Sequence, residues 1–358
     1  MAAAPPSPPR NVARAGFGIP SLDERGGPVA VRVEELEASP FHVLLAFDCP
    51  HRAAAGTVVL IPPMSGVLPW IMREMIIGLL PRYRVLVPEW VDPRFVPRAA
   101  GSFGFSHNIA AVISALRMAG PGAGLIALCQ SGGPSLAATA VMEESDDPAT
   151  PALLILLGSP IDPAANPTSL SRHFATAPSF RLAFSISPVP FGYPGWGRPV
   201  YSADTQRSLL AAARLHHTLF PPWLGGNEHP DLAELERRLP FSDYSRVMMD
   251  VDARHFIENI DIVFRRRALP RGRLRYDGDP VDTAAIRRCA LVTVEGTQDG
   301  IVGPGQTVAA HALCPDLPDD RRLAVLIEGC DHLSLFRGKS FRNLVLPHLL
   351  AGLARWVD

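Results

Sequence analysis

A short apolar run that passes directly into small and polar residues decides the fold: residues 125–138 read LIALCQSGGPSLAA. LIAL has the length and composition of one buried strand. GGPSLAATAVM, which follows at 132–142, suits a helix, because proline is well tolerated in a first helical turn. A direct strand-to-helix turn would therefore fall on Cys129 and project its side chain from the end of the strand.

Similar apolar runs recur along the chain and alternate with helical patterns. The strand candidates are residues 29–36, 41–48, 57–62, 84–90, 125–129, 152–158, 290–296 and 323–329. The first two alternate apolar and polar residues, as antiparallel strands do, whereas the later ones are nearly continuous, as parallel strands covered on both faces are. The helical patterns are 68–80, 106–119, 133–144, 304–313 and 338–356. This order predicts an α/β fold, with a mostly parallel sheet and helices on both faces.

Two stretches depart from this alternation. Residues 163–283 contain no clear parallel-strand pattern, are rich in proline and aromatic residues at 180–199, and then become helical. We expect this stretch to fold over the sheet as a cap or lid insertion. The start of the chain is rich in alanine and proline, which predicts a disordered N-terminal tail over residues 1–25. The core would then comprise residues 26–162 and 284–358.

Charge and cysteine content exclude several classes of function. The net charge is −1, which argues against nucleic acid as the main partner. The five cysteines form no C-x-x-C pair, so neither a disulfide framework nor a zinc site is indicated, and a reducing cytoplasm fits best. No apolar stretch has the length of a membrane span. We expect no cofactor and no metal.

Three residues that could carry chemistry each come just after a buried strand candidate. Cys129 follows LIAL, Asp299 comes after ALVTVEG, and His332 comes after LAVLIEG. The carboxyl ends of parallel strands meet at one edge of a sheet, where such folds place their active sites. A helix N-terminus beside Cys129 would favour its thiolate form. The chain order of nucleophile, acid and base is that of α/β hydrolases, so the sequence predicts this fold with a Cys-His-Asp triad.

The residues leave some alternatives open. Ser131 could be the nucleophile, with Gly133 in the last position of a G-x-S-x-G motif, if the strand ran two residues further. Glu295 is a weaker rival to Asp299 as the acid. The predicted oxyanion hole combines the backbone N–H of Gln130 with a donor from the loop after residues 57–62, where Ser65 and Gly66 are the candidates.

Longer stretches resemble one known family, the intracellular polyhydroxyalkanoate (polyhydroxybutyrate) depolymerases, over residues 30–356. The similar stretches are PMSG (63–66), LVPEWVDPRFVP (86–97), ALCQ-x₃-P-x-LAA-x₂-VM (127–142), LGSPIDPAANPT (157–168), FSDYSRVMMDVDARHFIENIDIVF (241–264), GDPVDTAAIRR (278–288), LVTVEGTQDGI (291–301), GQTVAAHALC (305–314) and HLSLF (332–336). The resemblance implies a cysteine nucleophile with aspartate and histidine, which fall on Cys129, Asp299 and His332. It also implies hydrolysis of stored polyester at the surface of a cytoplasmic granule.

The chain departs from this family at three places. Ser131 stands where the family tends to have proline, Val67 stands where a histidine usually follows PMSG, and residues 190–240 match poorly. These differences leave the triad intact, and they bear on the lid, the oxyanion loop and the preferred substrate.

The expected reaction is ester hydrolysis in amorphous polyhydroxyalkanoate through a thioester on Cys129, with release of 3-hydroxyacid monomers or oligomers. The aromatic segment 174–196 and Trp223 are candidates for contact with the polymer. Three alternatives stay open: a thiol-dependent esterase on smaller acyl substrates, an acyltransferase to a thiol such as coenzyme A, and a non-catalytic granule-binding homologue. A homo-oligomer and the preferred monomer length also stay open.

Overall fold

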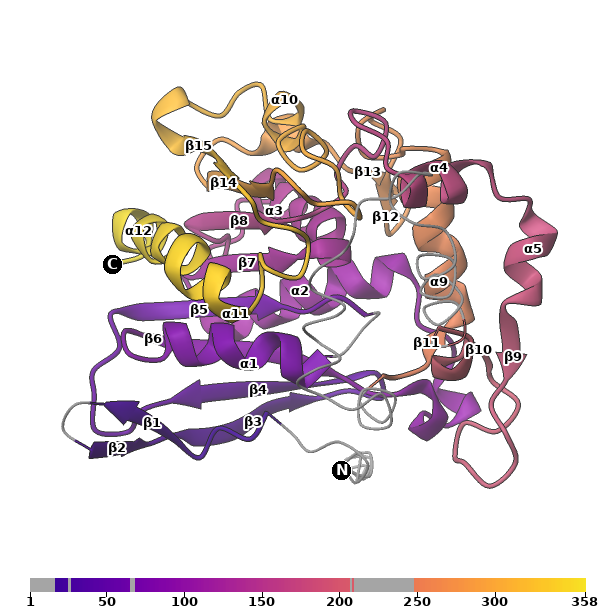
Figure 1. Ribbon diagram of the computed structural model, residues 1–358, viewed down its shortest axis with the longest axis horizontal. Coiled ribbons are helices and arrows are strands. Elements are labelled where there is room, and N and C mark those ends of the chain that lie inside the picture. The colour runs from indigo at the N-terminus through magenta and orange to yellow at the C-terminus, as the bar shows by residue number, and fades with distance from the viewer. Residues whose placement is uncertain (1–16, 25–26, 65–67, 207, 209–247) are drawn as a thin grey trace.

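The structure is a computed structural model that describes residues 17–24, 27–64, 68–206, 208 and 248–358 (Figure 1). Within these residues one large sheet has the order β15-β14-β8-β7-β5-β6-β4-β3. Its strands are β3 (Arg32–Ala38), β4 (His42–Asp48), β5 (Gly56–Ile61), β6 (Tyr83–Trp90), β7 (Gly124–Leu128), β8 (Leu153–Leu157), β14 (Ala290–Gly296) and β15 (Arg322–Ile327). The strands from β15 to β6 pair in parallel, whereas β4 pairs antiparallel with β6 and with β3. The predicted mostly parallel sheet is therefore confirmed.

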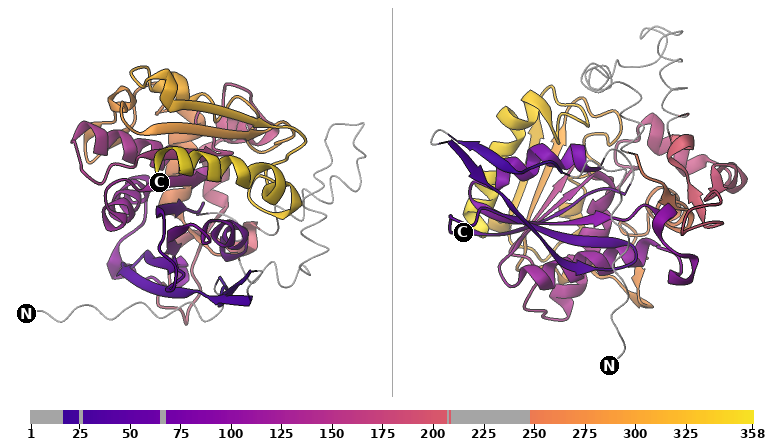
Figure 2. Two further views of the ribbon diagram at one scale, coloured as in Figure 1. Left: turned by 90° about the vertical axis from the view of Figure 1, so that its left-hand side faces the viewer. Right: turned by 90° about the horizontal axis from the view of Figure 1, so that it is seen from below.

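Helices cover both faces of this sheet, as Figure 2 shows. The helices α1 (Leu68–Leu79) and α12 (Leu346–Trp356) lie on one face, and α2 (Phe105–Ala119) and α3 (Gly132–Glu144) lie on the other. Alternate residues of each central strand pack against opposite layers, so neither face of these central strands is left to solvent. Each fully buried aliphatic side chain contributes about 1.5–3 kcal/mol. Burial on both faces explains why these strands read as continuous apolar runs.

The chain between β8 and β14 adds no strand to the large sheet in its described part. Its described elements are α4 (Ser169–Thr176), α5 (Ser179–Phe184), β9 (Ile186–Pro188), β10 (Pro199–Tyr201), β11 (Val251–Asp252), α9 (Ala253–Asn259), a π-helical turn (Ile260–Arg265), β12 (Arg275–Tyr276) and β13 (Asp279–Pro280). In Figure 1, α4, α5 and α9 lie together beyond one end of the sheet. The interpretation of residues 163–283 as a cap or lid stays a prediction, and residues 209–247 lie outside the described part.

Buried charges tie this intervening segment to the core. The guanidinium of Arg198 is buried and donates to the carboxylate of Asp252 and to the backbone carbonyls of Val96 and Pro97. A buried ion pair without such partners would be costly, because both charges lose their hydration. These bonds fix the segment that contains β10 and β11 against the loop after β6.

Asp250, which precedes β11, is expected to make stability depend on pH. Burial and the charge of Asp92 raise the pKa of Asp250 to about 6, although the backbone N–H of Ala203 and the guanidinium of Arg94 act the other way. An aspartate in the unfolded chain has a pKa of about 3.9, so protonation of Asp250 favours the folded state. This contribution to stability is complete below about pH 3.9 and is lost as the pH rises through about 6. As the pH rises from 5 to 8, the free energy of unfolding of the Asp250→Asn variant should therefore increase by about 1 kcal/mol relative to that of the wild type.

Thermal unfolding at these two pH values measures the gain, and Asp147→Asn is the matched control. Burial raises the pKa of Asp147, but the backbone N–H of Ala149 and the guanidinium of Arg117 outweigh it and hold this pKa below its ordinary value. Asp147 is then ionised at both pH values, so its replacement should shift the unfolding temperature equally at both. Equal shifts for the Asp250→Asn variant would contradict the prediction.

The N-terminal tail is shorter than predicted. Phe17, Ile19 and Leu22 are buried, and the Phe17 ring meets the Phe47 ring edge-on at 5.2 Å. Strand β1 (Ser21–Glu24) pairs with β2 (Gly27–Ala30). A disordered tail over residues 1–25 is therefore wrong for residues 17–24, where alternate apolar side chains extend the core, and residues 1–16 lie outside the described part.

Two predicted helices are also shorter or divided. The predicted helix 304–313 is reduced to α10 (Ala310–Leu313), because Gly305 has a φ of 104°, outside the helical region. The predicted helix 338–356 consists of α11 (Gly338–Ser340), a π-helical turn (Phe341–Val345) and α12. Pro347 lies in the first turn of α12, where its missing N–H costs least. In the described part of the chain, no helix is both long and apolar enough to cross a membrane.

Candidate active site

The turn after β7 holds Cys129 in a strained conformation. Cys129 has a φ of 49°, in the left-handed region that residues other than glycine seldom adopt, and the chain then passes through a 3-10 turn (Cys129–Ser131) into α3. Such a conformation costs of the order of 1–3 kcal/mol and is found mostly at functional sites. It is the sharp strand-to-helix turn that the sequence predicted, and it leaves Cys129 half-buried at the end of β7.

The close backbone approach at this turn falls on Gly132. A Cβ added at position 132 would lie 2.3 Å from Ser159 Oγ, in the loop after β8, whereas a Cβ at Gly133 would meet only Phe105 at 3.8 Å. Glycine is therefore required at position 132, three residues after Cys129, and not at position 131, two residues after it. This shift explains how Ser131 can occupy the position that the G-x-S-x-G motif assigns to glycine.

Ser131 uses its hydroxyl inside the protein. Its Oγ lies 2.9 Å from the carbonyl oxygen of Ile61 and 2.8 Å from that of Leu128, and the residue is almost completely buried. β7 ends at Leu128, so the strand does not run on through Cys129 and Gln130 as a nucleophilic Ser131 would require. The alternative that Ser131 is the nucleophile is therefore wrong in its structural premise.

The structure brings Cys129, Asp299 and His332 together. His332 Nδ1 lies 2.7 Å from Asp299 Oδ2, and both side chains are buried. The second carboxylate oxygen, Asp299 Oδ1, accepts the backbone N–H groups of Ile301 at 2.9 Å and Val302 at 2.8 Å. Cys129 lies close enough to the His332 ring to raise its pKa. The three residues thus lie together in the order expected of a nucleophile, base and acid.

Two neighbouring side chains act on the pKa of His332. Burial lowers the pKa of the imidazole, but the charges of Asp299 and Cys129 and the hydrogen bonds to both outweigh it and hold the pKa well above its usual value. Gly158, at the end of β8 with a φ of 52°, lies against the same ring, and an added Cβ would lie 3.4 Å from it.

Glu295, the rival acid, has a structural role. It is the sixth residue of β14 and is buried. Its carboxylate accepts the backbone N–H groups of Gly305, Thr307 and Val308 at 2.6–3.1 Å. These contacts hold the loop after β14 in place. A catalytic acid would instead direct its carboxylate at the histidine.

The predicted oxyanion hole is only partly within the described residues. Gln130 lies in the first turn after β7, where backbone N–H groups have no partner within the helix. Ser65 and Gly66 lie outside the described part. Met64, in the same loop, donates its N–H to Gln130 Oε1 at 3.2 Å. Met64 is the first N–H donor after β5, because Pro62 and Pro63 have no N–H.

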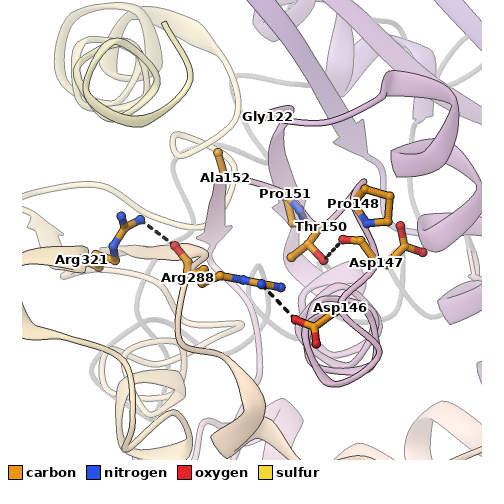
Figure 3. A pocket seen from close by; sticks show the side chains of 9 residues that line it. All are labelled: Gly122, Asp146, Asp147, Pro148, Thr150, Pro151, Ala152, Arg288 and Arg321. Carbon is orange, nitrogen blue, oxygen red and sulfur yellow. Dashed lines mark hydrogen bonds and ion pairs between the residues drawn. The ribbon is translucent and has the colours of Figure 1, made fainter.

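A second candidate site lies at the opposite end of the sheet. A cavity of about 350 Å³ is lined by residues that come just before β7, β8, β14 and β15, including Gly122, Ala152, Arg288 and Arg321 (Figure 3). Arg288 pairs with Asp146 at 3.0 Å, and Arg321 donates to the carbonyl of Arg288. Arg288 and Asp146 neutralise each other, and the cavity lies at the amino ends of the strands, away from Cys129, Asp299 and His332. Among the described residues no cluster of three or more metal-ligating side chains occurs.

The sheet order, the strained turn after β7 and the residues after β14 and β15 define the class of protein, an α/β hydrolase. Residues 158–356, more than half of the chain, match the family model described as PHB de-polymerase C-terminus. The chain belongs to this family, the polyhydroxybutyrate depolymerases, and is a carboxylic-ester hydrolase. No curated protein matches the chain in sequence.

Similar solved structures share the fold. A carboxylesterase from the thaumarchaeon Nitrososphaera gargenis has a TM-score of 0.52 at 15% identity, covering 94% of this chain and 99% of its own. A hypothetical protein from Pseudomonas aeruginosa has a TM-score of 0.50 at 10% identity, covering 96% and 97%. DcsB in complex with its substrate analogue has a TM-score of 0.50 at 12% identity, covering 92% and 100%.

Proposed function

We propose that the protein hydrolyses ester bonds of amorphous polyhydroxyalkanoate, such as poly(3-hydroxybutyrate), through a thioester on Cys129 and releases 3-hydroxyacid monomers or oligomers. The observation that carries this proposal is the hydrogen-bonded pair of His332 and Asp299, with Cys129 at a strained turn and close enough to raise the pKa of His332. Membership of the depolymerase family supplies the class of polymer. The same proposal locates the protein in the cytoplasm, at the surface of storage granules.

In the first half of the reaction, the Cys129 thiolate attacks an ester carbonyl of the polymer. The backbone N–H of Gln130, with Ser65 and Gly66 as the predicted partners, stabilises the tetrahedral oxyanion. Collapse of this intermediate breaks the ester C–O bond, and the leaving alkoxide takes the proton of the His332 imidazolium. The products are a free chain end and a 3-hydroxyacyl thioester on Cys129.

In the second half, neutral His332 takes a proton from a water molecule that attacks the thioester. The new tetrahedral intermediate expels the Cys129 thiolate and releases a 3-hydroxyacid, which restores the imidazolium–thiolate pair. Asp299 holds the imidazole by Nδ1, so its Nε2 faces the reacting groups in both halves. A thiol could replace water in this half, and product analysis with and without coenzyme A separates hydrolysis from transfer.

The experiment that tests the function compares two substrates. Amorphous poly(3-hydroxybutyrate) granules and a short soluble ester of 3-hydroxybutyrate are given to the wild type, and released 3-hydroxyacids are quantified. Faster release per ester bond from granules supports a depolymerase. Hydrolysis of the soluble ester alone would favour the small-substrate esterase, and no hydrolysis of either would favour a granule-binding homologue.

Exposed aromatic side chains support contact with an apolar polymer. Phe184 and Phe191 are 86% and 83% exposed, and Phe180 and Trp196 are also exposed. They form two edge-on pairs, Phe180 with Phe184 and Phe191 with Trp196. Large exposed apolar groups that gather on one segment are uncommon unless they bind something. Trp223, the other candidate, lies outside the described residues.

We expect Phe184→Ser and Phe191→Ser to weaken binding to amorphous granules by about tenfold each, because a buried phenylalanine contributes about 1.5–3 kcal/mol. Hydrolysis of the soluble ester should not change. Leu326→Ser is the matched control, since Leu326 on β15 is also exposed but lies outside this segment. Sedimentation of protein with granules measures binding, and equal losses in all three variants would contradict a role for the aromatic segment.

A further inference from the structure

The side chain of Gln130 has a feature that the mechanism above does not use. Gln130 directly follows Cys129, and its Oε1 accepts the backbone N–H of Met64 at 3.2 Å. The amide therefore bridges the turn after β7 and the loop after β5. These are the two segments that supply oxyanion donors in this fold.

The hydrogen bond to Met64 also determines which way the amide faces. A backbone N–H can only donate, so the atom beside it must be the amide oxygen, and the NH₂ end must point away from Met64. Nε2 has no hydrogen-bond partner among the described residues, and Gln130 is half-buried. Its two N–H groups therefore have no acceptor among the described residues, and they belong to the residue that directly follows Cys129.

The loop that fixes this amide is itself held in place. Ser131 Oγ bonds to the carbonyl of Ile61, and Trp90 Nε1 donates to the carbonyl of Pro62 at 3.1 Å. The chain just before Pro63 is therefore anchored, two residues from the N–H that Met64 donates to Gln130. A donor that is oriented before substrate arrives needs no reorganisation during the reaction, which is the property that makes oxyanion sites effective.

We propose that the Nε2–H of Gln130 donates to the oxyanion, so that this residue contributes to catalysis through both its backbone and its side chain. The inference rests on the proposed acyl transfer at Cys129. Hydrogen bonds to an oxyanion are roughly twice as strong as those to a neutral carbonyl. The contribution therefore appears in the transition state, which lowers the barrier to catalysis with little effect on substrate binding.

Two variants separate the donor role from the anchoring role. Gln130→Glu keeps an acceptor for the Met64 N–H but carries no N–H donor, whereas Gln130→Met has neither. Both should lose about 10²–10³-fold in kcat on a short soluble 3-hydroxybutyrate ester, with little change in KM, because removal of one oxyanion donor has effects of this size. Wild-type kcat in the glutamate variant would show that the amide only anchors the loop. Wild-type kcat in the methionine variant would show that it does neither.

Alkylation supplies a readout that does not involve an oxyanion. Iodoacetamide should alkylate Cys129 in Gln130→Met at the wild-type rate, since that displacement forms no tetrahedral intermediate. Slower alkylation would show that the amide acts on the thiol, and this would overturn the proposal. A wild type that hydrolyses no ester would contradict the proposed function itself, which is a different outcome from an unaffected variant.

Discussion

Cys129→Ala should abolish release of 3-hydroxyacids from amorphous polyester and from a soluble ester. The alanine side chain cannot form the thioester, and binding and oxyanion contacts alone leave only a small residual rate. Loss of the nucleophile in enzymes of this logic costs about 10⁴-fold or more in kcat. The fold should persist, because both cysteine and alanine have a Cβ at the same φ of 49° and the local strain is unchanged. Product analysis and the thermal unfolding temperature check the two parts.

Ser131→Ala is the matched control for this loss. It removes a buried hydroxyl next to the turn, so it should lower stability by about 1 kcal/mol while the nucleophile remains. Retained hydrolysis in Cys129→Ala, or equal loss in both variants, would exclude Cys129 as the nucleophile.

The cysteine content makes an independent test available. None of the five cysteines forms a disulfide, and Cys129 is half-buried, whereas the other four, Cys49, Cys289, Cys314 and Cys330, are buried. Burial raises the pKa of the Cys289 thiol well above its usual value and that of Cys314 to about 12, so these two should react slowly with alkylating reagents. One equivalent of iodoacetamide should therefore label Cys129 and remove activity in step with labelling.

The sheet could be predicted because its information is local. Strands covered on both faces need apolar side chains at consecutive positions, and β7 and β14 show this in their sequence without reference to the rest of the chain. The positions of Cys129, Asp299 and His332 could be predicted as well, because the carboxyl ends of parallel strands meet at one edge of the sheet. For the residues after β14 and β15, the order of the strands along the chain was enough.

The features that the sequence alone could not decide depend on contacts between distant residues. Glu295 resembles a candidate acid until the loop at Gly305–Val308 folds back onto its carboxylate. The required glycine at position 132 reflects Ser159, which belongs to a different strand–loop unit. Phe17 and Ile19 look like part of a tail until Phe47 supplies a surface for them. No local pattern records these partners.

The carboxylate within β14, Glu295, and the one that follows the strand, Asp299, can be separated by the size and kind of their effects. Asp299→Asn should reduce kcat by about 10⁴-fold, the loss seen when the acid of such a triad becomes an amide. The asparagine oxygen would still accept hydrogen bonds from the N–H groups of Ile301 and Val302, so its NH₂ group would face His332 Nδ1. The imidazole would carry its proton on Nε2, where it cannot accept one from the thiol or from water.

The same replacement removes the charge that supports the imidazolium. With Asp299 neutral, burial dominates and the pKa of His332 falls, so alkylation of Cys129 below neutral pH should slow relative to the wild type. Glu295→Gln is the control: it should lower the unfolding temperature, because the loop at Gly305–Val308 loses a charged acceptor, and leave the pH dependence of alkylation unchanged. The opposite pattern, a larger kcat loss and an altered alkylation profile in Glu295→Gln, would assign the acid to β14 itself and not to the turn that follows it.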